Sequence, residues 1–181
     1  MKVLCIGDSN TYGFDPRSYI DARYPEEVRW TSRLEKARDI SVINFGINGM
    51  TIPGDHSIFT DLIRRKDPDQ VVVMLGTNDI LEGAGALIVS KRMESFLASL
   101  RTMKKPILLI APPALQEGES VPDEETIGES KKIGDLYREA AERNACRFAD
   151  AARWGIELTF DGVHFSASGH DTFANKLAEL L

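Results

Sequence analysis

Apolar residues gather in short continuous runs along this chain. Four runs are clear, at residues 3–6, 41–45, 71–75 and 107–110, and a weaker run spans residues 146–149. These runs are continuous and do not alternate with polar positions, which is the pattern of parallel strands covered on both faces. The sequence therefore predicts five strands, four of them deeply buried.

Between these runs, apolar positions recur at the spacing of amphipathic helices. This spacing predicts helices over residues 26–38, 55–65, 86–103, 124–144 and 167–181. Asp55 and Ser166 stand where N-caps would begin the second and the last of these helices. The apolar face of each helix is most simply explained as a surface that packs on the core.

Strands and helices alternate along the whole chain, which predicts a three-layer α/β/α sandwich around a parallel sheet. We expect the flavodoxin-like strand order 2-1-3-4-5. A length of 181 residues suits a single domain over residues 1–181, with one substantial core. The long acidic stretch at residues 112–125 follows the fourth strand, where either a lid or a solvated surface loop would fit.

Charge and composition exclude some partners. The net charge is −6, and Lys and Arg are scattered, so no basic face for nucleic acid or an anionic membrane is expected. No apolar run has the length of a membrane span. The short run before Asp8 is too brief for the apolar part of a signal peptide, so the cytoplasm is the expected compartment. Cys5 and Cys146 have no CxxC partner and are expected to be small buried apolar residues.

Polar motifs follow the predicted strands at the points where the strands end. The first strand leads into GDS (7–9), the second ends in NFG (44–46) and the third leads into GTND (76–79). The carboxyl ends of parallel strands share one edge of the sheet, and this is where open α/β sheets bind their ligands. A fourth motif, DGVH (161–164), precedes the last predicted helix. We expect the four motifs to form one site.

The motifs contain the residues of nucleophilic catalysis. A serine hydroxyl is a weak nucleophile until a base takes its proton, and imidazole groups titrate near neutrality. His164 is therefore the candidate base for Ser9, and Asp161 can orient the far side of the same ring. Taken alone, Ser9 is more simply the cap of a turn. The nucleophile elbow GxSxG is not satisfied, because Thr11 stands in place of its second glycine.

Three groups at the strand ends are candidate donors to an oxyanion. They are the backbone N–H of Ser9, the backbone N–H of Gly46 and the side-chain amide of Asn78. A glycine lets the backbone approach a substrate closely, and a neutral amide donates without a change of protonation. Each group also has a simpler interpretation, a tight strand-exit turn for Gly46 and an Asx-turn for Asn78.

The other histidines have weaker contexts. His170 lies within the last predicted helix and is expected at the surface. His56 opens the second helix, where it could lie near the rim of the site. The three histidines with Asp55, Asp79 and Asp161 match no compact metal-binding spacing such as HExxH, so no metal is expected.

These motifs resemble those of the SGNH, or GDSL-type, esterase and lipase superfamily. Its four blocks supply serine, glycine, asparagine and histidine, which Ser9, Gly46, Asn78 and His164 match, and Asp161 matches the aspartate that precedes the histidine. A closer similarity is to the bacterial arylesterase and acyltransferase branch, which acts on small esters. The segments that carry it are residues 7–13, 23–25, 28–30, 74–79 and 111–113.

The resemblance implies a carboxylester hydrolase that forms an acyl-enzyme and needs no metal or organic cofactor. The short loops favour a small ester with an acetyl-like acyl group as its substrate. Asn10 replaces the leucine or similar apolar residue of the family, at a position that is not catalytic there. The candidate substrate contacts flank the motifs and are Asp8, Asn10, Tyr12, Ile80 and Val163.

Several alternatives remain open from the sequence. A carbohydrate O-deacetylase, a thioesterase or a lysophospholipase could use the same residues, and a homo-oligomer is possible. A non-catalytic small-molecule-binding module predicts a broken motif set, whereas every motif residue is present here. A nucleotide or phosphate binder is disfavoured, because Asp8 would repel phosphate after the first strand and no Walker or GxGxxG pattern follows.

Overall fold

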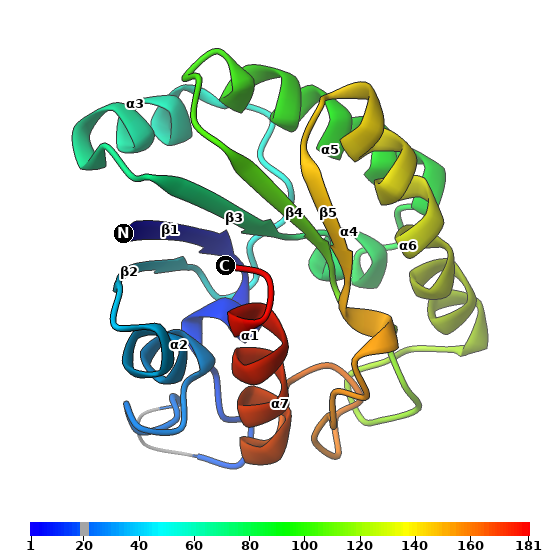
Figure 1. Cartoon of the computed structure of the whole chain (residues 1–181). Coiled ribbons are helices and arrows are strands. Elements are labelled where there is room, and N and C mark those ends of the chain that lie inside the picture. The colour runs from blue at the N-terminus through cyan, green and yellow to red at the C-terminus, as the bar shows by residue number, and fades with distance from the viewer. Residues whose placement is uncertain (19–21) are drawn as a thin grey trace.

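The computed structural model describes residues 1–18 and 22–181, and it shows one parallel sheet between two layers of helices (Figure 1). Its strands are β1 (Lys2–Gly7), β2 (Ser41–Gly46), β3 (Gln70–Met74), β4 (Ile107–Ala111) and β5 (Arg147–Asp150). They lie in the order β2-β1-β3-β4-β5, and every neighbouring pair is parallel. The predicted α/β sandwich and its strand order are confirmed.

The three central strands, β1, β3 and β4, are buried on both faces, whereas the edge strands β2 and β5 are mostly half-buried, so the expectation of deep burial is not met for β2. In a central strand, alternate residues enter two different cores. In β1, Leu4 and Ile6 pack into the first core, whereas Val3 and Cys5 pack into the second. All four are at most 1% exposed. This two-sided burial explains why the strands read as continuous apolar runs in the sequence.

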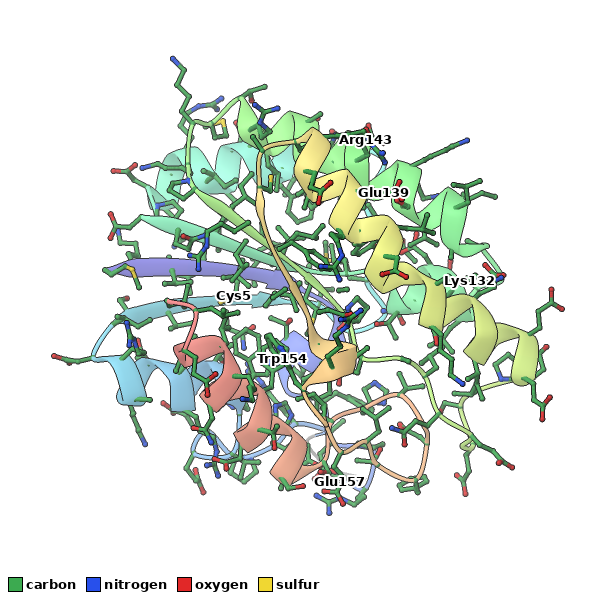
Figure 2. All side chains as sticks on the ribbon, turned by 45° about the vertical axis from the view of Figure 1, so that its right-hand side comes forward. Cys5, Lys132, Glu139, Arg143, Trp154 and Glu157 are labelled. Carbon is green, nitrogen blue, oxygen red and sulfur yellow. The ribbon has the colours of Figure 1, made fainter. Side chains whose placement is uncertain are left out.

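Three helices cover the first core, namely α3 (Ser57–Lys66), α5 (Ala86–Arg101) and α6 (Glu124–Arg143). Phe59 of α3 and Phe96 of α5 meet edge to face, with ring centroids 5.1 Å apart. Figure 2 shows Lys132, Glu139 and Arg143 on the side of α6 that faces away from the sheet. Within the described residues, none of the helices combines the length and apolar character needed to cross a membrane.

Two helices cover the opposite face, namely α2 (Trp30–Arg38) and α7 (Ala167–Ala178). The ring of Trp30 in α2 lies 4.7 Å from that of Phe173 in α7, and both side chains are fully buried. Trp154, labelled in Figure 2, contacts Phe173 from the segment before α7, at 5.2 Å. These aromatic contacts hold both helices on the sheet face that carries the second core.

Short helices follow three of the strands, namely α1 (Ser9–Tyr12) after β1, α4 (Thr77–Leu81) after β3 and η1 (Ala151–Arg153) after β5. Because the strands are parallel, all three begin at the same edge of the sheet. In Figure 1, α1 and α4 lie near each other at this edge. The fold therefore gathers segments that are far apart in the sequence, as ligand sites of open α/β sheets require.

One helix begins later than the sequence predicts. The apolar spacing suggested a helix from residue 26, but α2 begins at Trp30. The residues before it form a turn in which the Val28 N–H donates to the Pro25 carbonyl at 3.0 Å. Arg29 has an extended backbone and is the N-cap. The turn separates the helix from Pro25, so the apolar pattern overestimated the helix by one turn.

The two predicted N-caps have different outcomes. Ser166 caps α7 as expected, since its side chain accepts a hydrogen bond from the Gly169 N–H. The N-cap of α3 is His56, one residue after the predicted Asp55. The Asp55 carboxylate accepts from the Ser57 N–H at 2.9 Å, so it binds an N–H of the helix from outside the cap position.

Candidate active site

Ser9 is the first residue of α1 and directly follows the end of β1. Asp8 is the N-cap, and its side chain accepts from the Asn10 N–H at 3.0 Å. Gly13 ends the helix after one turn with φ 90°, a left-handed conformation that suits glycine. This strand–cap–helix sequence fixes Ser9 at the carboxyl edge of the sheet.

His164 and Asp161 reach Ser9 from a loop between η1 and α7. His164 Nε2 lies 2.9 Å from Ser9 Oγ, although the two residues are 155 positions apart. His164 Nδ1 lies 2.5 Å from Asp161 Oδ2. An antiparallel bridge between Leu158 and Phe165 closes the loop. The structure thus brings the three predicted catalytic residues into one chain of hydrogen bonds.

The Asp161 carboxylate is almost fully buried but well hydrogen-bonded. Its Oδ1 accepts from the Thr159 hydroxyl at 2.7 Å and from the N–H groups of Val163 and His164 at 3.0 Å. Burial alone would raise the pKa of Asp161, but the bonds from His164, Val163 and Thr159 outweigh it and hold this pKa well below its usual range. The carboxylate therefore stays charged beside the imidazole and favours a proton on Nδ1.

Asp8 caps the turn that carries Ser9 and does not lie on an open surface. Its side chain is 1% exposed and caps α1. Burial raises the pKa of Asp8 to about 6, although the Asn10 N–H and the nearby His164 favour the charged form. A carboxylate so enclosed does not reach a ligand in the site. The expectation of a substrate contact at Asp8 is therefore wrong.

Asn10 joins the serine turn to the histidine loop. Its Nδ2 donates to the Val163 carbonyl at 3.1 Å, and its Oδ1 accepts from the Phe165 N–H at 2.9 Å. These two bonds lie on either side of His164. The Asn10 carbonyl also accepts from Trp30 Nε1 at 2.9 Å. Asn10 is 3% exposed, so it positions the imidazole segment and is not the expected substrate contact.

Two of the remaining expected substrate contacts differ from the prediction, whereas a substrate contact at Tyr12 stays a prediction. Val163 and Ile80 are buried in the first core, which excludes both as walls of an open site. Tyr12 is half-buried, and the Arg23 guanidinium lies 4.1 Å from its ring centroid. Phe14 packs on the His164 imidazole, with ring centroids 4.6 Å apart.

Gly46 does not fit its expected role as an oxyanion donor. Its N–H already donates to Asn44 Oδ1 at 2.9 Å. A Cβ at Gly46 would lie 2.1 Å from the Tyr12 backbone nitrogen, so glycine is needed for the packing of α1 on β2. Asn44 Nδ2 strengthens this contact by donating to the Thr11 carbonyl at 2.7 Å. Gly46 is therefore a packing residue, and this prediction is corrected.

Two other backbone donors are open at the same edge. The N–H of Ser9 and the N–H of Gly49 make no hydrogen bond to any residue that the structure describes. Gly49 is exposed, has φ 72° and lies in a turn closed by the Met50 N–H on the Ile47 carbonyl at 3.1 Å. Sequence reasoning missed Gly49, although an Asn-Gly pair just after a strand is a strong turn signal.

The motif after β3 holds this turn in place. Asn78 Nδ2 donates to the Met50 carbonyl at 3.0 Å, which uses one of its two amide hydrogens. The neighbouring Asp79 is fully buried, and its Oδ2 accepts from the Ile52 N–H at 2.8 Å. Its Oδ1 pairs with Arg92 at 2.7 Å. Asn78 therefore borders the same turn as Gly49 and keeps a donor for a ligand.

His170, expected at the surface, is fully buried. Its ring contacts Tyr24 at 5.1 Å and Phe165 at 5.4 Å, and its Nδ1 accepts from the Trp30 N–H at 3.4 Å. Burial lowers the pKa of His170 to about 3, so the ring is neutral at ordinary pH. Its spacing of three residues from Phe173 places it on the apolar face of α7, a signal that the prediction passed over.

His56 is occupied by contacts within the fold. Its Nδ1 lies 2.6 Å from Ser99 Oγ and its Nε2 lies 3.0 Å from the Pro53 carbonyl. These bonds tie the start of α3 to α5 and leave no ring nitrogen for a ligand. Within residues 1–18 and 22–181, no three His, Cys, Asp or Glu side chains gather as a metal ion would require.

The acidic stretch at residues 112–125 lies against the turn that carries Asp161. The N–H of Gln116 donates to the Gly162 carbonyl at 3.0 Å, and that of Ser120 donates to the Asp161 carbonyl at 3.1 Å. A Cβ at Gly118 would lie 2.3 Å from the Asp161 backbone carbon. These close backbone contacts favour a supporting role for the stretch over that of a lid.

Comparison with known proteins places this geometry among esterases. The chain matches a model of the GDSL-like lipase/acylhydrolase family over residues 5–172, which includes all four motifs. It is 30% identical to a GDSL lipase of Mycobacterium tuberculosis over 99% of this chain and 80% of that protein. It is 28% identical to an arylesterase of Vibrio mimicus over 55% of this chain and 48% of that protein.

Solved structures of similar proteins share the whole architecture. The aryl esterase of M. smegmatis superposes with a TM-score of 0.86 at 25% identity, over 99% of this chain and 97% of that chain. A carbohydrate acetylesterase family member from Sinorhizobium meliloti superposes with a TM-score of 0.87 at 27% identity, over 99% of this chain and 96% of that chain.

Proposed function

Because the chain belongs to the GDSL-like lipase/acylhydrolase family and is a carboxylic ester hydrolase, we propose that it cleaves small, acetyl-like esters through an acyl-enzyme on Ser9. One observation carries the proposal. Ser9 Oγ, both ring nitrogens of His164 and Asp161 Oδ2 form one chain of hydrogen bonds, of 2.9 and 2.5 Å. A base so oriented activates a serine hydroxyl.

In the first half of the reaction, Ser9 Oγ bonds to the ester carbonyl carbon while its proton moves to His164 Nε2. Asp161 stabilises the resulting imidazolium and keeps the other proton on Nδ1. The carbonyl carbon then loses its bond to the alcohol oxygen, and His164 gives its proton to that oxygen. The alcohol leaves, and the acyl group stays on Ser9.

In the second half, water replaces the alcohol. His164 takes a proton from the water, whose oxygen bonds to the acyl carbon. The bond between that carbon and Ser9 Oγ breaks, and His164 returns the proton to Ser9. The products are a carboxylic acid and the free enzyme. Another alcohol in place of water would give acyl transfer by the same steps.

Three donors at the strand ends are suited to the oxyanion that forms in both halves. They are the N–H of Ser9, the N–H of Gly49 and the second amide hydrogen of Asn78. The two backbone groups have no partner among the described residues, and Asn78 is tied to the turn that carries Gly49. One such donor contributes about 3 kcal/mol to transition-state stabilisation. Gly49 takes the role that the sequence assigned to Gly46.

The preference for a short acyl group rests on two observations. Ile80 and Val163, which flank the motifs, are part of the core and do not line the site. Phe14, which packs on the His164 imidazole, therefore offers only a short apolar surface for an acyl chain. The similar structures include a carbohydrate acetylesterase family member and an aryl esterase. The proposed substrate is therefore an acetyl-like ester of an aryl, alkyl or sugar alcohol.

The test is hydrolysis of p-nitrophenyl esters from acetyl to dodecanoyl by the wild type and the Ser9→Ala variant. The wild type should favour the acetyl ester, and Ser9→Ala should lower kcat/KM by at least about 10⁴-fold. Ser41→Ala, an exposed serine at the start of β2, is the matched control and should keep full activity. Equal activity of wild type and Ser9→Ala would refute the acyl-enzyme, and a preference for dodecanoyl would refute the short acyl group.

A further inference from the structure

Two arginines next to the serine turn have no acidic partner. Arg23 and Arg29 make no ion pair with any residue that the structure describes. Nearby Arg17, in contrast, pairs with Asp15 at 3.0 Å. No carboxylate in residues 1–18 and 22–181 therefore pairs with either positive charge.

Both arginines face one cavity of about 540 Å³, whose walls also include two tyrosines and a proline. The lining residues are Tyr12, Arg23, Tyr24, Pro25 and Arg29. Tyr12 is the last residue of α1, and Ser9 is the first. Three residues of helix correspond to a rise of about 5 Å, so the cavity borders the short helix that carries Ser9 at its start, while Ser9 itself does not line it.

Arg23 is held in a fixed orientation that leaves donors free. Its guanidinium carbon lies 4.1 Å from the centroid of the Tyr12 ring, and its Nε donates to the Tyr12 carbonyl at 2.9 Å. These contacts use the face and one edge of the group, and its terminal N–H groups bind no residue in the ranges 1–18 and 22–181. Desolvation and the neighbouring charge of Arg29 lower the pKa of Arg23, as expected for two like charges that share a partly enclosed space.

Arg29 is half-buried like Arg23, and one of its donors is enclosed. Its stem packs so closely on Gly13 that a Cβ there would lie 2.6 Å from Arg29 Cγ. Its Nε is buried and has no hydrogen-bond partner. A buried donor without a partner is costly, and native proteins usually supply a partner or a bound ligand. Arg29 therefore has both the charge and the unused donor of an anion-binding group.

We propose that Arg23 and Arg29 bind an oxyanion group, carboxylate or phosphate, carried by the ester substrate. Guanidinium groups bind such groups through paired hydrogen bonds, and two of them on one cavity match the several oxygens of one anion. The inference rests on the proposed esterase function and names a substrate class for it. The enzyme should prefer esters with an anionic group a few ångströms from the ester carbonyl.

The experiment compares kcat/KM for 4-acetoxybenzoate and 4-acetoxybenzamide, which share the acetyl ester and differ in one negative charge. The wild type should favour the charged ester by about tenfold, and Arg23→Gln and Arg29→Gln should each lower this ratio several-fold. Arg29→Lys keeps the charge but loses the paired donors of the guanidinium group, so it should retain only part of the preference. Arg64→Gln is the control. Arg64 is exposed on α3, so this variant removes one positive charge at a different place on the protein.

A second measurement separates a substrate group from a free anion. Binding of inorganic phosphate to Ser9→Ala is followed by calorimetry, with and without Arg29→Gln. A ratio of kcat/KM that is equal in the wild type and both glutamine variants would overturn the proposal, and phosphate binding without any ester preference would assign the cavity to a free anion instead.

A failure of the proposed function gives a different result. In that case the wild type cleaves neither ester, whereas phosphate binding that is lost in Arg29→Gln would still support an anion site at these arginines. Absence of phosphate binding together with absence of an ester preference would exclude the site altogether.

Discussion

The two halves of the candidate active site are held by different kinds of contact. The serine turn, residues 7–13, continues directly from β1, which pairs with β2 on one side and β3 on the other. It packs on the backbone of Gly46. The histidine loop, residues 158–166, lies outside the sheet, and side chains of Asn10 and Asp161 bind its backbone.

This difference separates stability from catalysis. A change that disturbs the serine turn also disturbs the central strand and should be detected first as a loss of folding free energy. A change at the side chains of the histidine loop should leave the sheet intact and appear mainly as a loss of activity. Three predictions test this contrast, in order of decreasing effect.

The largest expected effect follows from Asp161→Asn. The amide would present Nδ2 to His164 Nδ1 as a donor, which leaves the ring proton on Nε2, where Ser9 needs an acceptor. Loss of the correct tautomer lowers kcat by about 10⁴-fold in comparable sites. Kinetics with p-nitrophenyl acetate measure the loss of activity, and the midpoint of thermal unfolding measures the loss of stability. We expect this midpoint to fall by only a few degrees.

Thr159→Val is the matched control for Asp161→Asn. It removes the hydroxyl that donates to Asp161 Oδ1 at 2.7 Å but keeps the carboxylate on the imidazole. We expect only a several-fold loss of activity.

The contribution of the Asp161 carboxylate to the free energy of unfolding should depend on pH. It should be present above about pH 4 and lost as the pH falls further, because the pKa of Asp161 is lowered in the folded protein. Wild-type activity of Asp161→Asn would contradict the assigned role of Asp161.

The serine half should respond in the opposite way to Gly46→Ala. The new Cβ would lie 2.1 Å from the Tyr12 backbone nitrogen, so α1 or β2 must move. We expect the free energy of unfolding to fall by about 3 kcal/mol, as measured by urea denaturation. Gly49→Ala is the comparison, because nothing lies within 4 Å of a Cβ there and its φ of 72° costs only about 1 kcal/mol. Equal stability of the two variants would contradict the packing role of Gly46.

The sequence was sufficient to predict which side chains meet at the candidate site but not the residues that support them. Ser9, Asp161 and His164 were predictable because acyl transfer restricts the residue types and parallel strands restrict where motifs meet. Gly46 and Gly49 follow the same strand, and only the Asn44 side chain decides which N–H remains open. Which of the two N–H groups stays without a partner depends on tertiary contacts, and no periodic pattern in the sequence indicates it.

Asn10 was misjudged for a related reason. It adjoins the nucleophile, so proximity in sequence suggested a substrate contact, whereas its partners lie on the histidine loop, 153 and 155 positions away. His170 shows the opposite error. Its spacing from Phe173 indicated burial, but its polar type suggested the surface. In both cases the tertiary environment determined the role of a polar residue.

The smallest of the three effects is expected at Asn10, which connects the two halves. Asn10→Leu removes both bonds beside His164 and leaves the Val163 carbonyl and the Phe165 N–H without partners. Two such bonds together contribute about 2 kcal/mol, or about a thirtyfold loss of activity if the imidazole is misplaced to that extent. The loss should be in kcat, with KM unchanged, because Asn10 is 3% exposed and does not contact substrate. Asn175→Leu, an exposed site on α7, is the control.

Asn10→Asp separates positioning from a purely structural role. The aspartate keeps the shape of Asn10 and the bond from the Phe165 N–H, but it places an oxygen against the Val163 carbonyl and adds a negative charge near His164. A negative charge favours the imidazolium, which cannot accept the Ser9 proton, so the acidic limb of the kcat/KM profile should move to higher pH. A variant that unfolds more easily but keeps the wild-type pH profile would show that Asn10 only stabilises the fold. A shifted profile with unchanged KM would show that residue 10 lies close enough to His164 to act on the base and not only on the fold.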